Sequence, residues 1–536
     1  MHKSFDCSFG GIFIAMLFVA LTSTWTAADE VTEAKQPAAP KPLVTISKET
    51  TYYTEPLRPD GYVDYMAVAN ALASEGVTPE NNAAVLLLKA FGPAEIGKEI
   101  RDQFQEKMGI DPLPDEGNYF VPFEEFVEAK GLKRKAQNKA KDDWDHCVSH
   151  PWKTKRYPLV AEWLTQNEHP ISLMADASRC SRYYSPGIAG DDEPQVVCMI
   201  LPVIVHTRTA ARVLLCRAML QAGNGEIDEA WNDVLAVHRL ARSIGTGPTL
   251  IDGLVAIAID AIASQGTATL AYHAPLTKEQ ATRFAGDLEK LPPMPEMVGR
   301  LKAERIMFLD AISHFARKGP NEFARSIDGL GVGNDRPMLA KIFERAGFRA
   351  IDWDVILRMG NQCYDRLEAA GSMPPGPKRK AAFNKLDEDL NARMQNAKDL
   401  KKLTLSLLAA KPPRKIVSES VGNIMLALFF PALNAVFDAE TRDLANSRME
   451  PVVLALSAYR AAEGEYPKKL DVLAPEFLAA IPRDPYIGEP IRYKRTRKGY
   501  VLYCVGPDGE DNGGRGRMSD SHEHDDIAFF APPKKR

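Results

Sequence analysis

Two short segments of the chain hold most of its candidate metal ligands. The first is the run Asp142-Asp143-Trp144-Asp145-His146-Cys147, which is followed by His150. In a helix, His146 and His150 would share one face, where two imidazoles can bind zinc with a Glu or Asp as general base. Polar residues at the end of a helix give the same composition without a metal. Both interpretations are open at this point, and the first would make the protein a metal-dependent hydrolase.

The second segment is an acidic, glycine-rich stretch near the end of the chain. Its oxygen-bearing residues are Asp508, Glu510, Asp511, Asn512, Asp525 and Asp526, and its glycines are Gly506, Gly509, Gly513 and Gly514. Carboxylate and amide oxygens are ligands that Ca²⁺ prefers, and the glycines would let backbone carbonyls turn inward. A solvated acidic turn without an ion is the alternative interpretation.

Other motifs with a known chemistry are missing from the sequence. It contains no P-loop, no Gly-x-Gly-x-x-Gly run after a strand and no Gly-x-Ser-x-Gly elbow, so nucleotide and serine-hydrolase chemistry lack support. No Cys-x-x-Cys pair occurs, which excludes a zinc ribbon or a thioredoxin-like site. The run His522-Glu523-His524 lacks the i, i+4 spacing of a zinc protease and is interpreted as a solvated loop.

The composition is that of a globular protein with a large core. The 536 residues are 45% hydrophobic and 26% charged, and the net charge is -4, which argues against a protein that coats nucleic acid. Several polar residues interrupt apolar helical runs, and ion pairs that fix helix register are the favoured explanation over a ligand groove. These residues are Arg208, Arg212, Arg217, Asp233, Arg239, Asp252, Asp260, Glu304 and Arg305.

The first residues predict export from the cytoplasm. Lys3 precedes the apolar run Ile12 to Leu21, and the small residues Thr26 and Ala28 fit a signal-peptidase site. We expect residues 1–28 to be a signal peptide, residues 29–50 to be a linker, and the mature protein to be periplasmic or extracellular. An uncleaved signal would instead anchor the protein, and this would be its only membrane contact. The six cysteines that remain are widely spaced, which predicts one disulfide at most.

Residues 51–373 have the periodicity of a helical domain. Apolar residues return every three or four positions, and the clearest unit is a helical hairpin from Val203 to Ile244 that turns at Gly223-Asn224-Gly225. This hairpin is similar to one tetratricopeptide-type helix pair, in which the small Ala230 lets the two helices approach closely. The pattern does not recur at a fixed period. The sequence therefore predicts an irregular multi-helix domain, with a helical-repeat solenoid as the alternative.

The last third of the chain has a different pattern. Residues 374–415 form a basic, proline-flanked linker with a charged helix, and residues 416–536 begin with a long helix from Ile416 to Glu463. Three strands are predicted after it, from Ile491 to Arg497, Tyr500 to Val505 and Ile527 to Ala531, the first two as a hairpin. The whole chain is thus predicted to be mainly α, with a small α+β unit that contains a three-stranded antiparallel sheet.

About the last 90 residues resemble a known family by the order of their motifs. These motifs are Tyr459, Gly464-x-Tyr466-Pro467, Pro482-x-Asp484-Pro485, Gly499-Tyr500, Gly506-Pro507-Asp508-Gly509 and Asp526-Ile527. In this order they resemble the C-terminal globular domain of the major pseudopilins of type II secretion systems. The chain departs from that family because its comparable apolar helix lies deep in the sequence, near Ile424, so a role as a filament subunit is unsupported.

The resemblance implies a helix packed on a small antiparallel sheet, with Ca²⁺ joining the last loop to the sheet. Asp508 and Asp526 match the acidic positions of the family and are the first-choice ligands, with Glu510 and Asp511 in reserve. The resulting hypothesis is an exported, envelope-associated binding or assembly protein that contacts a protein partner and has neither a catalytic centre nor a nucleic-acid partner. The alternative is the hydrolase built on Asp145, His146 and His150.

Overall fold

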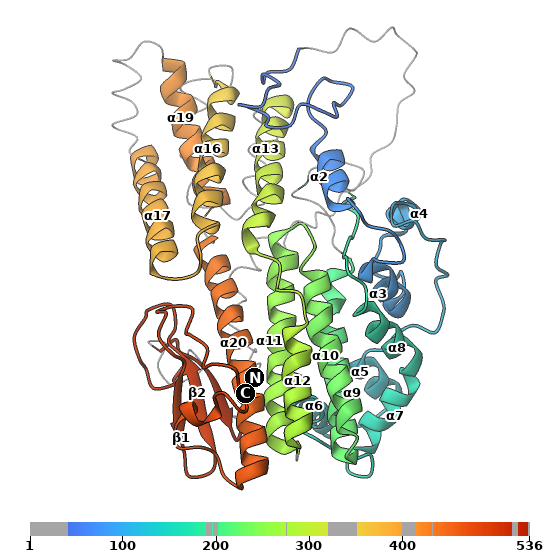
Figure 1. Cartoon of the computed structure of the whole chain (residues 1–536). Helices are drawn as coiled ribbons and strands as arrows, with labels where there is room; N and C mark the ends of the chain where they lie inside the picture. Colours follow the sequence, from blue (N-terminus) through green and yellow to red (C-terminus); the bar gives the residue numbers. More distant parts are fainter. Residues whose placement is uncertain are drawn as a thin grey trace.

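The protein is mainly helical, with one small sheet near the end of the chain (Figure 1). A computed structural model describes residues 41–188, 196, 202–274, 276–319, 351–398, 413–430, 433–516 and 524–533. Within these ranges it has sixteen α-helices and one three-stranded antiparallel sheet, which confirms the predicted fold class at this level. The predicted signal peptide, residues 1–28, lies outside the described residues.

In the described part of the chain, seven helices precede the hairpin. They are α2 (Tyr65–Ala73), α3 (Ala83–Phe91), α4 (Lys98–Lys107), α5 (Phe123–Ala129), α6 (Arg134–Ser149), α7 (Pro158–Gln166) and α8 (Glu168–Ala177). The residues Thr78-Pro79-Glu80 have the pattern of a helix start, which predicts a helix from Glu80, but α3 starts after Asn82. The Asn82 side chain accepts hydrogen bonds from the amides of Ala84 (3.1 Å) and Tyr184 (2.9 Å). A contact with a distant segment therefore decides where this helix begins.

The predicted helical hairpin is confirmed as α9 (Ile204–Asn224) and α10 (Ile227–Ile244). Gly225 has φ +90° at the turn, a backbone conformation that favours glycine. Gly223 is needed for packing, because a Cβ there would lie 1.8 Å from the carbonyl oxygen of Trp152. Helices α11 (Leu250–His273) and α12 (Lys278–Glu289) follow, and each starts with a capping box, from Thr249 and Thr277 respectively.

Helix α11 is long and apolar enough to cross a membrane by length and composition. However, 72% of its apolar window is buried inside the protein, and α11 packs against α9, α10 and α20 (Leu433–Glu463). The core helix of a soluble protein passes the same test of length and hydropathy. The apolar character of α11 is thus weak evidence for a membrane span.

A second helical group lies at the other end of the molecule (Figure 1). It contains α13 (Leu301–Lys318), α16 (Trp353–Gly371), α17 (Pro377–Lys398) and α19 (Pro413–Phe429). The single long helix predicted from Ile416 to Glu463 is divided into α19 and α20 on either side of Pro431, whose ring cannot continue the helical hydrogen-bond pattern.

The sheet has the strands that the sequence predicted. Strands β1 (Arg492–Arg495), β2 (Tyr500–Cys504) and β3 (Ile527–Ala531) pair antiparallel in the order β1-β2-β3. Arg495 pairs with Tyr500 across the β1–β2 turn, which confirms the hairpin. Strands β2 and β3 contact α20, and the side chains of Leu502, Cys504 and Phe529 are buried.

Helix α20 connects two hydrophobic cores. The part of α20 around Val436 and Phe437 belongs to the core of α2, α13, α16, α17 and α19, whereas residues 445–458 belong to the core of α3–α12 and the sheet. The boundaries expected at 374 and 416 therefore do not separate the cores. The expected linker also ends early, because Val44 is buried and Asn361 donates hydrogen bonds to the carbonyls of Glu49 (3.1 Å) and Thr50 (2.8 Å).

Candidate functional site

The acidic loop, residues 506–516 and 524–526, connects β2 to β3 and brings its two ends into contact. A Cβ on Gly506 would lie 2.1 Å from Oδ1 of Asp525, so this approach requires glycine. Gly514 has φ +80°, and a Cβ there would lie 2.6 Å from Val501. Gly506 therefore allows the close approach of the loop ends, and Gly514 allows a left-handed turn.

Asp526 is the buried carboxylate of the acidic loop. The residue is only 5% exposed, and Oδ2 of its side chain accepts a hydrogen bond from the Gly514 amide at 2.7 Å. Its Oδ1 is buried and has no hydrogen-bond donor among the described residues. Burial raises the pKa of Asp526, and the charges of Asp511 and Asp508 raise it further, although two backbone amides oppose the shift. Asp526 therefore lies where the carboxylates of Asp508 and Asp511 are also close.

Asp508 lies near Asp526 and is joined to the other end of the loop. Its backbone amide donates to Oδ2 of Asp525 at 3.1 Å, and its own Oδ1 accepts from the Glu510 amide at 2.8 Å. Glu510 is exposed and contributes this backbone contact. The sequence analysis counted Asp525 among the oxygen-bearing residues but not among the preferred ligands. In the structure, its side chain is hydrogen-bonded to the backbone of Asp508.

Asp511 already has a cationic partner. Its Oδ2 lies 3.2 Å from Nε of Arg492 on β1, and its Oδ1 accepts hydrogen bonds from the Tyr503 hydroxyl (3.1 Å) and the Gly513 amide (2.9 Å). These contacts hold the loop against the sheet without an ion. Of the four predicted ligands, Asp508 and Asp526 have the environment best suited to a hard cation, while Asp511 is neutralised by Arg492.

The histidines predicted to form a zinc site do come together, but Asp145 is held elsewhere. The rings of His146 and His150 stack with centroids 4.6 Å apart and planes 4° apart at the end of α6. Asp145 Oδ1 instead lies 2.7 Å from a guanidinium nitrogen of Arg212 on α9. The carboxylate proposed as a general base is thus ion-paired.

A third histidine, which the sequence analysis missed, completes this cluster. His273 is the last residue of α11, and its ring centroid lies 5.7 Å from that of His150. Partial burial lowers the pKa of His273, and the positive charges of His150 and Arg460 lower it further. No local signal could have found this residue, because only the packing of α9 against both α6 and α11 brings the two segments together.

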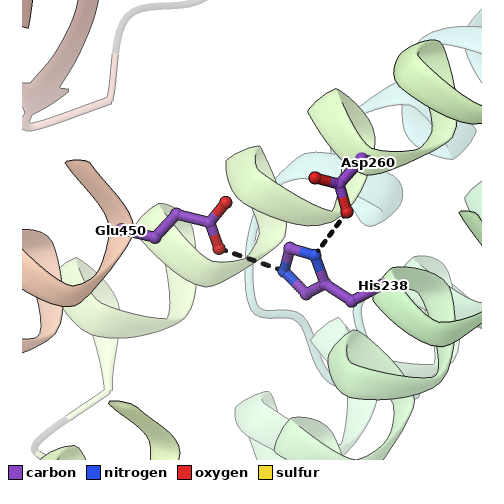
Figure 2. Close-up of side chains that lie close together, drawn as sticks. All are labelled: His238, Asp260 and Glu450. Atoms are coloured by element: carbon purple, nitrogen blue, oxygen red, sulfur yellow. Dashed lines mark hydrogen bonds and ion pairs between the residues drawn. The ribbon is translucent and has the colours of Figure 1, made fainter. Parts of the chain in front are cut away.

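The sequence analysis also missed the most deeply buried polar cluster, of which it named only Asp260. In this buried ionic network, Nδ1 of His238 lies 2.8 Å from Oδ1 of Asp260, and Nε2 lies 3.1 Å from Oε2 of Glu450 (Figure 2). The three side chains come from α10, α11 and α20, and each is at most 3% exposed. Nε2 also lies 3.2 Å from the Thr267 hydroxyl. Arg242 and Asp443 also belong to this network.

The charges of the buried ionic network balance. Burial opposes a charge on His238, but Glu450 and Asp260 outweigh it and raise the pKa of His238 to about 9. Burial likewise opposes a charge on Asp260, but His238 and Arg242, which binds the same carboxylate oxygen, lower the pKa of Asp260 to about 2. Burial and the charge of Asp260 raise the pKa of Asp443 well above its usual range, which disfavours a further negative charge in the network.

These contacts fit an internal ion-pair network better than a metal site or a catalytic site. His238, Asp260 and Glu450 offer ligand atoms within 4.8 Å of one another. However, the two ring nitrogens of His238 face different carboxylates, and one ion could bind only one of those nitrogens. Arg242 already neutralises Asp260. Because the side chains of the triad are almost completely buried, they could not contact a substrate from solvent.

Two further candidate features are the cysteines and a surface cavity. The five cysteines in the described ranges are free, and burial raises the pKa of Cys147 to about 12, so Cys147 is a poor thiol nucleophile. A cavity of about 470 Å³ opens between α20 and the start of α12, where Thr277, Lys278 and Arg460 are among its lining residues. Its lining includes none of Asp145, His146 and His150.

Several of the polar residues predicted to form ion pairs do so, and two of these pairs join neighbouring helices. Arg217 on α9 donates two hydrogen bonds of 2.7 Å to the carboxylate of Asp233 on α10, and Arg305 pairs with Asp365 at 2.8 Å. Both pairs join neighbouring helices, so the sequence interpretation as ion pairs is confirmed for them.

Comparison with known proteins gives no match: neither a protein family, nor a curated protein, nor a solved structure is similar to this chain. Its function must therefore be inferred from its own residues and their geometry.

Proposed function

We propose that this chain is an exported binding or assembly protein whose C-terminal α+β unit is stabilised by Ca²⁺ bound in the acidic loop. The observation that carries the proposal is the environment of Asp526, a buried carboxylate near Asp508 with one oxygen that lacks a donor among the described residues. A hard divalent cation would neutralise this excess charge. Asp508, Asp525 and Asp526 are the carboxylates that we assign to it.

The pseudopilin-like interpretation of this unit has support from its arrangement. A long helix, α20, packs on a three-stranded antiparallel sheet, and the acidic loop joins two of the strands. The motif order from Tyr459 to Ile527 supports the same interpretation. The helical part is proposed to be an irregular multi-helix domain rather than a solenoid, because its helices range from 7 to 24 residues without a repeated pair.

The proposal favours binding over catalysis, with a protein partner in the cell envelope. His238, Asp260 and Glu450 are joined by ion pairs and are almost completely buried, so a substrate in solvent cannot reach them. Residues 1–28 give the export signal, and determining the N-terminus of the mature protein would test cleavage after Ala28. A hydrolase built on Asp145, His146 and His150 has less support, because Arg212 holds the carboxylate.

Thermal unfolding of the full chain tests the calcium site. At a calcium concentration 100 times the dissociation constant, we expect about 3 kcal/mol of added stability relative to the protein in chelator. Asp526→Asn keeps the acceptor for the Gly514 amide but removes the charge, so it should abolish most of this gain. The isolated C-terminal unit is unsuitable, because α20 also packs against α11 and α12.

Asp511→Asn is the matched control for this experiment. It removes a charge from the same loop, but a charge that Arg492 neutralises, so the response to calcium should remain. If calcium does not change the unfolding midpoint of the wild-type protein, or if Asp526→Asn responds as strongly as the wild type, the calcium proposal is wrong.

A further inference from the structure

We propose that the cavity between α20 and the start of α12 binds a small organic anion that carries a carboxylate or a phosphate group. Its volume of about 470 Å³ is within the range of about 300–1000 Å³ that is typical of sites for small ligands. The cavity lies where the connection from α11 to α12 meets the last residues of α20. It is separate from the acidic loop, so the inference does not depend on the calcium proposal.

Arg460 lines the cavity with a positive charge that no carboxylate balances. Its guanidinium group donates hydrogen bonds to two neutral oxygens, the Tyr466 hydroxyl at 2.8 Å and the Tyr272 carbonyl at 3.1 Å. Among the described residues, Arg460 forms no ion pair, and its Nε–H group has no acceptor. An arginine side chain in a protein is always protonated, so an anion from solution is needed to balance this charge.

Two tyrosine rings hold the guanidinium group of Arg460 in place. Its Cζ lies 5.6 Å from the ring centre of Tyr272 and 5.2 Å from that of Tyr466. Tyr466 is buried, and its ring packs edge to face against Tyr500 on β2, with ring centres 4.9 Å apart. A cation that is already positioned loses little conformational freedom when it binds a ligand, so Arg460 is prepared to bind a carboxylate or phosphate group.

Lys278, the first residue of α12, adds a second cation to the lining. Its ammonium group pairs with Glu476 and lies 4.6 Å from the ring centre of Phe477. The ion pair is on the surface, where the side chain of Glu476 is 64% exposed, so water screens its attraction. An ammonium group has three N–H donors, and the pair with Glu476 leaves donors of Lys278 for a ligand.

The rest of the lining suits a small ligand with an apolar body. Its side chains are short or apolar, and the residues are Ala274, Leu276, Thr277, Ser457, Ala461 and Ala462. The Ser457 hydroxyl already donates to the Ala271 carbonyl at 2.7 Å, so the two cations are the main polar groups that a ligand would meet. None of the described lining residues is acidic, and an anion would therefore meet no like charge in the wall.

Ligand-observed NMR titration of the full-length protein with benzoate and with phenyl phosphate tests the proposal. Benzamide, which has the same ring without the charge, is the matched neutral probe. At low ionic strength, we expect saturable binding of one anion per chain, and we expect benzamide to bind at least about tenfold more weakly. The comparison of the two anions shows whether the site prefers a carboxylate or a phosphate group.

Two variants and a control locate the bound anion. Arg460→Gln removes the charge but keeps a hydrogen-bond donor, and it should weaken anion binding by at least about tenfold. Ala461→Leu keeps both cations and fills the cavity from an exposed position, so it should weaken binding without unfolding the protein. Lys290→Ala removes a lysine that is 78% exposed at the other end of α12, and binding should remain unchanged.

Three results would contradict the proposal. It is overturned if the wild-type protein binds neither anion, or if benzamide binds as tightly as the anions do. Circular dichroism shows which variants are folded, and Ala461→Leu tests the cavity even where Arg460→Gln does not fold. The proposal is also overturned if a folded one of these two variants binds the anion as tightly as the wild type.

Discussion

The buried ionic network and the acidic loop are both clusters of carboxylates, but their charges are balanced differently. In the network, Asp260 lies against His238 and Arg242, and the pKa of Asp260 falls. In the loop, burial raises the pKa of Asp526, and the charges of Asp511 and Asp508 raise it further. A cluster completed by internal cations holds the fold together, whereas a cluster with excess negative charge is prepared for a cation from solution.

The comparison also explains where each cluster lies. The network joins α10, α11 and α20, three helices of one core, and its charges must be neutralised within the protein because no water reaches them. The acidic loop lies at the end of the sheet, where Asp508 and Glu510 are exposed. Water or an ion can compensate charges there, so the loop tolerates an imbalance that the core could not.

Removal of the central cation should have the largest effect. His238→Ala leaves Asp260 with only Arg242 and leaves Glu450 without a cationic partner inside the core, so we expect a loss of about 3–5 kcal/mol. Urea unfolding at pH 7 measures this loss, with His169→Ala as an exposed control that should change stability by less than about 0.5 kcal/mol. A loss below 1 kcal/mol in His238→Ala would contradict the assigned role of the network.

The stability of the protein should depend on pH because His238 is the central cation of the network. The pKa of His238 is about 9 in the folded protein and near 6.5 in the unfolded chain, so its contribution is complete below pH 6.5. It is lost as the pH rises through 9, with a total of up to about 3 kcal/mol. Urea unfolding from pH 6 to pH 9.5 measures this decline. In His238→Gln the decline should be much smaller, and parallel curves for the two proteins would refute the assignment.

Removal of a charge from the acidic loop should have the smallest effect when calcium is absent. In chelator, Asp526→Asn retains the acceptor for Gly514 and reduces repulsion with Asp508 and Asp511, so stability should stay constant or rise by up to about 1 kcal/mol. Asp260→Asn, the equivalent change in the network, should instead cost about 3–5 kcal/mol. Chemical denaturation of both variants in chelator compares them directly, and similar losses would remove the distinction between the clusters.

The elements of the fold were largely predictable because their signals are local. The hairpin of α9 and α10 follows from apolar periodicity and Gly225, and the three strands follow from alternation and short turns. The helix predicted from Ile416 to Glu463, with Pro431 as an interruption of its apolar first half, is two helices, α19 and α20. The start of α3 was misplaced because Asn82 is fixed by Tyr184, a contact between distant segments.

The candidate sites were also predictable only where their residues are close in the sequence. The sequence by itself determined the acidic loop and the His146/His150 pair, because their members are neighbours in the chain and spacing alone brings them together. Only the tertiary structure decided that His273 joins that pair, that Arg212 removes Asp145 from it, and that His238 meets Glu450. Helix packing sets these distances, and the residues involved are too far apart in the sequence for any local pattern to record them.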